Sequence, residues 1–246
     1  MSDIQSPTAV DLAHARSLLF TPGDDEAGLR SALASAADAV VGDLEHSVAP
    51  ERKQAARDLV AELRPPVVRV NGADTAWFEA DLALVAELDP AAVVLPAATP
   101  ETVSALGAAG PPVIAIVETG AGVRLAYETA SRPRVAALLL GAVDLGADLG
   151  LEPRRDGLEL AYARGKLVVD SAAAGVRPPF DVVHLDVHDD AGLEHECRLA
   201  RSLGFRGKAC LAPAQLETVH RVFGTVEEEL AARTRRIPAE AKGARG

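Results

Sequence analysis

Arginine and acidic side chains close several apolar runs of this sequence, and they are its best candidates for chemistry. Arg69, Glu118 and Asp144 each stand at or just after the end of such a run. A guanidinium fixed in this way can hold a carboxylate or an enolate oxygen through two parallel hydrogen bonds. Arg69 can also pair with an acid of the protein itself, such as Asp43 or Glu45, and the two roles are compatible.

Glu118 and Asp144 belong to consecutive strand–helix units, so we expect their carboxylates on adjacent strands around one cavity. Two carboxylates, completed by water and a substrate oxygen, are a common setting for an octahedral Mg²⁺ ion. Solvated or salt-bridged acids are the alternative interpretation of this pair when it is taken alone. The pair therefore indicates a magnesium site only in combination with further motifs.

The segments that must position these residues alternate regularly between strand and helix. The predicted strands are residues 17–21, 39–45, 66–71, 91–96, 112–118, 135–141, 181–186 and 207–212. The predicted helices include residues 25–37, 51–63, 75–87, 100–109, 158–175, 189–203 and 213–222. Such alternation indicates parallel strands joined by crossover helices.

Eight such units in 246 residues favour an α/β fold of the (β/α)₈ TIM-barrel type, with an open doubly wound sheet as the alternative. We expect the barrel over residues 15–233, between a flexible N-terminus (1–14) and a flexible C-terminal tail (234–246). In such a barrel the catalytic groups stand at the carboxyl ends of the strands. Arg69, Glu118 and Asp144 occur at these positions.

Composition excludes several classes of partner. The net charge of −11 argues against a nucleic-acid surface or an anionic membrane as a partner. The longest apolar runs, such as residues 135–143, are far shorter than the roughly 20 residues of a membrane-spanning helix, and the N-terminus lacks an apolar signal segment. We therefore expect a cytoplasmic protein. Cys197 and Cys210 lack zinc-ligand or disulfide-framework spacing, which predicts buried, reduced thiols.

Many motifs in a fixed order resemble the HpcH/HpaI aldolase/citrate lyase family, in particular its citrate lyase beta-subunit-like (CitE-like) branch. The motifs include "RSLLFTPG" (16–23), "ADAVVGDLEHSVAPERKQAAR" (37–57), "VVRVNG" (67–72), "IAIVETGAGV" (114–123), "LLLGAVDLGADLG" (138–150) and "AYARGKLVVDSAAAG" (161–175). The resemblance covers roughly residues 15–230. It implies a TIM barrel that assembles as a homotrimer or a multiple of it.

The resemblance also implies a Mg²⁺-dependent carbon–carbon lyase or aldolase. Its substrates would be a small 2-keto acid and an acyl-CoA or acyl-carrier thioester of the citryl, malyl or citramalyl type. A thioesterase, or a 2-keto-acid aldolase without coenzyme A, is one alternative. A non-catalytic paralogue that binds an acyl-thioester or a partner enzyme is another.

Carried onto this chain, the family pattern implies that Glu118 and Asp144 are the metal ligands and that Arg69 binds substrate and stabilises the enolate. Glu45 would act beside the metal by ordering a water. Arg16 would bind substrate, although it begins its strand, so an ion pair at the opposite end of the barrel is equally compatible with its position. Gly120 of the "ETGAG" turn is a further substrate-binding candidate.

The chain departs from the family pattern at several strand ends. Ala97 stands where relatives read lysine in Leu-Pro-Lys, Ala212 where they read histidine in His-Pro, and His46 where they read aspartate in Leu-Glu-Asp. The C-terminal lid of fuller lyases is expected to be mostly missing. His46, His184 and His188 are then the remaining candidates for proton transfer, with a structural role as the alternative for each.

Overall fold

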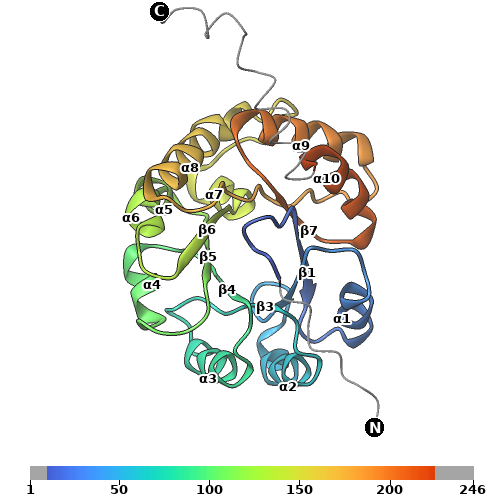
Figure 1. The fold of residues 1–246 in the computed structure, drawn as a ribbon, viewed down its shortest axis with the longest axis vertical. Helices are drawn as coiled ribbons and strands as arrows, with labels where there is room; N and C mark the ends of the chain where they lie inside the picture. Colours follow the sequence, from blue (N-terminus) through green and yellow to red (C-terminus); the bar gives the residue numbers. More distant parts are fainter. Residues whose placement is uncertain (1–9, 225–246) are drawn as a thin grey trace, which may run out of the picture.

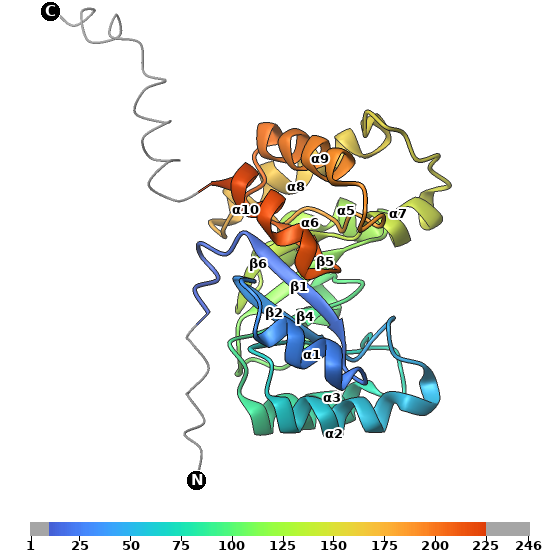
Figure 2. The ribbon, with the colours of Figure 1, turned by 90° about the vertical axis from the view of Figure 1, so that its right-hand side faces the viewer.

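The computed structural model describes residues 10–224 as one parallel sheet surrounded by helices. The sheet has seven strands in the order β6-β5-β4-β3-β2-β1-β7, and every neighbouring pair is parallel. Figure 1 shows the strands curling around a common centre with the helices outside them, and Figure 2 shows α2 and α3 at one end of the view and α8 and α9 at the other. The predicted parallel α/β architecture is confirmed.

Strands and helices alternate along the chain as predicted. The strands are β1 (Ser17–Pro22), β2 (Ala39–Asp43), β3 (Val67–Arg69), β4 (Ala92–Leu95), β5 (Val113–Val117), β6 (Val135–Leu140) and β7 (Lys208–Cys210). The α-helices are α1 (Glu26–Leu33), α2 (Lys53–Leu63), α3 (Phe78–Leu88), α4 (Pro100–Ala105), α5 (Gly120–Arg124), α6 (Ala126–Ala130), α7 (Ala142–Leu149), α8 (Ala161–Ala174), α9 (Asp190–Leu203) and α10 (Leu216–Phe223). Short 3-10 turns are η1 (Pro50–Arg52), η2 (Leu158–Leu160) and η3 (Pro213–Gln215).

Both faces of the sheet are buried, which explains why the strands are nearly continuous apolar runs. Leu18 and Phe20 of β1 pack with Ile114 and Ile116 of β5 on the inner side of the curl. Alternate residues such as Leu19 pack on the outer side against the helices. Because successive side chains of a strand point to opposite faces, one strand contributes to both cores.

The predicted strand over 181–186 is wrong as a strand. Only single bridges are formed, from Phe180 to Leu139 of β6 and from Asp181 to Lys208 of β7. Two prolines, Pro178 and Pro179, precede the segment and have no N–H to donate to a ladder. Asp181 is instead fully buried in ion pairs, 3.0 Å from Arg164 and 3.1 Å from Lys208. The sheet therefore has seven strands rather than the predicted eight.

Side-chain caps account for several helix starts. Asp25 accepts from the Gly28 amide before α1, Thr99 accepts from the Thr102 amide before α4, and Asp189 accepts from the Gly192 amide before α9. Helices α5, α6 and α7 were not among the predicted helices. The segments of α5 and α7 contain glycine and read as turns, and α5 and α6 have only five residues each.

The predicted tails fall largely outside the described residues. This holds for residues 1–9 of the N-terminal tail, for the last residues of the predicted barrel (225–233) and for the C-terminal tail over 234–246. Among the described residues, no helix is long and apolar enough to cross a membrane.

Candidate active site at the carboxyl ends of the strands

A cavity of about 590 Å³ opens at the carboxyl ends of the strands. Apolar side chains from the inner core, such as Phe20, Ile116 and Leu139, form part of its wall. Its polar lining consists of a few side chains from different strand ends: Thr21, Asp43, His46, Ser47, Arg69, Glu118 and Asp144. A mostly apolar hollow with a few converging charges is typical of a small-molecule site.

Arg69 binds two acids of the protein at the edge of this cavity. Its Nε and Nη2 atoms each lie 2.6 Å from a carboxylate oxygen of Asp43, and its Nη1 atom lies 2.8 Å from Oε2 of Glu45. Its guanidinium carbon is 5.2 Å from the centre of the Phe20 ring. Burial alone would lower the pKa of Arg69, but Asp43 and Glu45 raise it above its ordinary value. The ion-pair role considered from the sequence is therefore present.

The register of β2 and β3 explains this pairing, because Asp43 and Arg69 are directly opposite partners at the ends of the two strands. Asp43 is buried and also accepts from the Glu45 amide at 2.8 Å and from the Ser47 hydroxyl. Burial would raise the pKa of Asp43, but Arg69 and these donors lower it below its ordinary value. Asp43 therefore organises the loop that carries Glu45 and His46.

Glu118 has a very different environment directly after β5. Its side chain is 7% exposed, and its Oε1 accepts from the Ala97 amide at 2.6 Å. Burial, together with the charges of Asp144 and Glu45, raises the pKa of Glu118 to about 7 against the opposing effects of the Ala97 amide and the Arg69 charge. A Cβ on Gly141 would lie 2.5 Å from the Glu118 Cβ, so only glycine permits this approach of β6.

Asp144 lies in the first turn of α7 and lines the same cavity. Within residues 10–224 it makes no hydrogen bond or ion pair, and no lysine, arginine or histidine nitrogen lies within 4 Å of Glu118. No three acidic, histidine or cysteine side chains of these residues gather closely enough to ligate one ion. Two carboxylates without a cation do suit Mg²⁺, which commonly uses one or two carboxylates and keeps its waters. The donor set therefore fits a magnesium ion.

The other two predicted substrate-binding residues are not brought into the cavity. Arg16 precedes β1, at the opposite ends of the strands, and its guanidinium binds Asp38 at 2.8 and 3.0 Å. This corrects the substrate-binding expectation for Arg16 in favour of its alternative. Gly120 begins α5, where its amide donates to Asp148 at 2.7 Å, and it does not line the cavity.

Among the three candidate histidines, only His46 lines the cavity. Its Nδ1 lies 3.1 Å from Oε1 of Glu45. His184 instead contacts Glu196, with 3.0 Å between Nδ1 and Oε1, and His188 is exposed. The structure therefore leaves His46 as the histidine that could exchange a proton within this cavity.

Two positions that depart from the family pattern follow strand ends but do not line the cavity. Ala97 has a φ of 44°, and its amide is the one that holds Glu118. Ala212 follows β7 and precedes the η3 turn.

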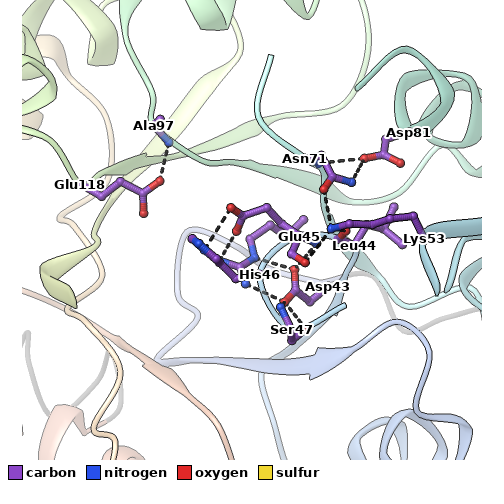
Figure 3. Close-up of polar contacts among 11 residues, drawn as sticks. Asp43, Leu44, Glu45, His46, Ser47, Lys53, Asn71, Asp81, Ala97 and Glu118 are labelled. Carbon is purple, nitrogen blue, oxygen red and sulfur yellow. Dashed lines mark hydrogen bonds and ion pairs between the residues drawn. The ribbon is translucent and has the colours of Figure 1, made fainter. Parts of the chain in front are cut away.

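Sequence reasoning missed a buried polar group behind these loops. Lys53 of α2 donates to the carbonyls of Leu44 and Glu45 and to the side chain of Asn71, which is bound in turn to Asp81 (Figure 3). A signal existed, since Lys53 shares its helix face with the buried Ala56 and Val60, at positions three and seven residues along.

Comparison with known proteins places this site in a family. Residues 16–213 match the model of the HpcH/HpaI aldolase/citrate lyase family. The (3S)-malyl-CoA thioesterase of Cereibacter sphaeroides is 37% identical over 236 residues, covering 91% of this chain and 82% of that protein. Citrate lyase subunit beta of Leuconostoc mesenteroides subsp. cremoris is 32% identical over 238 residues, covering 87% of this chain and 78% of that protein.

A solved structure is similarly close. CitE from Mycobacterium tuberculosis, in complex with magnesium, acetoacetate and coenzyme A, superposes with a TM-score of 0.82 at 35% identity. The match covers 96% of this chain and 90% of that chain. The sequence match and the shared fold agree with the resemblance seen in the motifs, and the chain belongs to the HpcH/HpaI aldolase/citrate lyase family.

Proposed function

We propose that this chain is a Mg²⁺-dependent carbon–carbon lyase acting on the coenzyme A or acyl-carrier thioester of a 3-hydroxy acid of the citryl, malyl or citramalyl type. The observation that carries the proposal is the lining of one cavity by a fixed cation, Arg69, and by two acids, Glu118 and Asp144, that form no ion pair within residues 10–224. The CitE structure with magnesium and coenzyme A supports both the ion and the carrier.

Glu118 and Asp144 would hold the magnesium ion. When bound, the ion supplies Lewis-acid polarisation of the 2-keto acid that is released or consumed. The Ala97 amide contributes by orienting one Glu118 oxygen and leaving the other available. Because Glu118 is only 7% exposed, its electrostatic interaction with a bound cation would be stronger than that of a solvated carboxylate.

Arg69 would stabilise the charge that develops on the thioester. Asp43 accepts hydrogen bonds from two of its five N–H groups, and Glu45 adds an ion pair with Nη1. The remaining donors can bind an enolate oxygen. Because Asp43 holds the guanidinium by two parallel hydrogen bonds, the cation is already oriented before substrate binds.

Proton transfer would fall to Glu45 and His46. In cleavage the substrate hydroxyl loses its proton, the adjacent carbon–carbon bond breaks, and its electron pair forms the enolate of the thioester, which is then protonated. His46 lines the cavity and contacts Glu45, so these two side chains can accept the first proton and supply the second.

Thioester hydrolysis is the second candidate activity. The specific observation in its favour is the 37% identity to the (3S)-malyl-CoA thioesterase of Cereibacter sphaeroides. Hydrolysis uses the same cation and acids, with water attacking the thioester carbonyl.

The two activities release different products, so one assay separates them. Malyl-CoA, citramalyl-CoA and citryl-CoA would be incubated with Mg²⁺ or with EDTA, while 2-keto acid and free thiol are followed independently. A lyase releases keto acid without free thiol, and a thioesterase releases free thiol without keto acid. Absence of both products from all three thioesters would reject both candidate activities on these substrates.

We also propose that the curled sheet closes as a barrel through the segment after α8. Phe180 accepts from the Leu140 amide of β6 at 3.0 Å, and Asp181 accepts from the Ala209 amide of β7 at 2.9 Å. Because these hydrogen bonds join the segment to β6 on one side and to β7 on the other, they support its place as the eighth stave between these two strands.

We propose in addition a homotrimer or a multiple of it. Apolar side chains near one another in the sequence are exposed on η2 and α8: Leu158 is 63%, Tyr162 75% and Val169 65% exposed. An exposed apolar patch of this kind supports association. Sedimentation that detected only a 25.5 kDa monomer at micromolar concentration would contradict this assembly.

A further inference from the structure

We propose that Lys53 is a positioning residue of this site. From the start of α2 it ties the loop after β2, which carries Glu45 and His46, to the loop after β3, which follows Arg69. Its effect on the loops is independent of the reaction, and only its effect on turnover rests on the proposed function.

The contacts of Lys53 carry this inference. Its side chain is nearly inaccessible, with the residue 5% exposed. Its Nζ lies 2.7 Å from the Leu44 carbonyl, 2.8 Å from the Glu45 carbonyl and 2.7 Å from Oδ1 of Asn71 (Figure 3). An ammonium has three N–H donors, and all three are therefore used. No donor remains for a substrate, so the role is positioning rather than catalysis.

Asn71 is itself fixed, which makes the tie rigid. Its backbone and side-chain N–H groups donate to one oxygen of Asp81, at 2.8 and 2.6 Å, and Arg57 binds the other oxygen at 3.0 Å. Because the Asn71 side-chain nitrogen is held by a carboxylate, its oxygen is the atom that faces Lys53. Figure 3 shows Asn71 between Lys53 and Asp81.

Lys208 provides a contrast within the same protein. It is also fully buried, but its Nζ binds two carboxylates, those of Asp181 and Glu196, at 3.1 and 3.0 Å. Within residues 10–224, the hydrogen bonds of Lys53 all go to neutral oxygens, two of them backbone carbonyls of the site loop, and its Nζ also lies 5.0 Å from the centre of the Trp77 ring. A buried charge is costly without such partners. Here two of the partners are the backbone carbonyls of Leu44 and Glu45, so the contact fixes the backbone that carries the Glu45 side chain.

The experiment compares Lys53→Met with Lys208→Met, which removes a buried ammonium away from the cavity. In the control Asp181 keeps Arg164 as a partner and Glu196 keeps His184. Hydrogen–deuterium exchange would be followed at the amides of Leu44, Glu45 and Ser47. Lys53→Met should accelerate their exchange at least about tenfold, because the two loops lose three hydrogen bonds to a charged group. Lys208→Met should leave these amides unchanged.

Turnover gives a second readout. Lys53→Met should lower kcat by about 10- to 100-fold with a smaller change in KM, as expected when a catalytic group moves by about 1 Å. Asn71→Ala leaves the two contacts between Lys53 and the backbone carbonyls in place. It is the second variant to be measured in case Lys53→Met does not fold. It should give the same two effects in weaker form.

Unchanged exchange in a folded Lys53→Met protein, or in Asn71→Ala if the first variant does not fold, would overturn the proposal. So would acceleration of equal size in Lys208→Met, since that would indicate general destabilisation. If the wild-type protein turned over none of the thioesters, the proposed function would fail while the exchange experiment still tested the role of Lys53.

Discussion

Acidic side chains on the β2–β3 side of the cavity and those on the β5–β6 side differ in their ion pairing and in the direction of their pKa shifts. On the first side Asp43 and Glu45 are both bound by Arg69, and the pKa of Asp43 is lowered. On the second side, within residues 10–224, Glu118 has a hydrogen bond from the Ala97 amide and no ion pair, and burial and neighbouring acids raise its pKa to about 7 although Arg69 and the Ala97 amide oppose this. The acids of the first side are in direct contact with a cation, and among the described residues those of the second side are not.

This difference separates the roles of the two sides. A region in which every charge is already paired changes little when a ligand arrives, which suits a preorganised group such as Arg69. A region with two acids and no cation is stabilised by a bound cation, because that ion relieves the repulsion between them. If this difference decides where Mg²⁺ binds, variants on the two sides should differ in their effect on Mg²⁺ affinity.

Loss of a carboxylate on the β5–β6 side should have the largest effect. Glu118→Gln should weaken Mg²⁺ binding by more than about 100-fold, since even changes behind metal ligands cost roughly 10- to 100-fold. Titration calorimetry with Mg²⁺ measures this. Asp148→Asn is the control, because Asp148 is an exposed acid of α7 that binds Gly120. Equal Mg²⁺ affinity in Glu118→Gln and wild type would remove the distinction between the two sides.

A change on the β2–β3 side should lower activity and stability while sparing the metal. Arg69→Lys keeps the charge but loses the paired hydrogen bonds to Asp43, so the free energy of unfolding should fall by roughly 1–3 kcal/mol. Substrate turnover should fall at least about tenfold, which corresponds to about 1.4 kcal/mol.

Denaturant unfolding and steady-state kinetics test the Arg69 variant. Arg16→Lys is the matched control, because Arg16 makes the same kind of paired contact with Asp38 at the other ends of the strands. It should lose stability and keep its turnover. Wild-type turnover in Arg69→Lys would assign Arg69 to structure.

Adding charge after the ends of β4 and β7 should have a moderate effect. Ala97→Lys combined with Ala212→His should lower KM for an anionic thioester by about two- to fivefold, as expected for exposed charges that contribute roughly 0.2–1 kcal/mol. Mg²⁺ affinity should stay the same, because the carboxylates are untouched. An unchanged thioester profile would mean that these two departures from the family pattern have no part in recognition.

The smallest effect should come from the backbone that holds Glu118. Ala97 has a φ of 44°, and a left-handed conformation costs a residue with a Cβ about 1–2 kcal/mol. Ala97→Gly should therefore raise the free energy of unfolding by about 0.5–1 kcal/mol after the entropy cost of glycine. Ala34→Gly, at an exposed residue with a φ of −88°, should lower it instead. Destabilisation in both variants would show that Ala97 is unstrained.

The strands, and the position of three polar residues around one cavity, were predictable because their signals are local. Seven of the eight predicted strands are present, since runs that are apolar on both faces can only be buried between two layers. Arg69, Glu118 and Asp144 were predicted at one cavity because polar side chains that end parallel strands meet at one edge. Neither inference needs the position of any distant side chain.

Tertiary structure decided how the charges pair. Arg16 and Arg69 are both arginines at strand ends, and only the positions of Asp38 and Asp43 show that one lies outside the cavity and the other at its edge. Likewise Lys53 reads as a solvated lysine until two carbonyls of the β2 loop are seen to point at it. A strand depends on the order of apolar residues along the chain, whereas a buried charge depends on which oxygens the folded chain brings within hydrogen-bond distance.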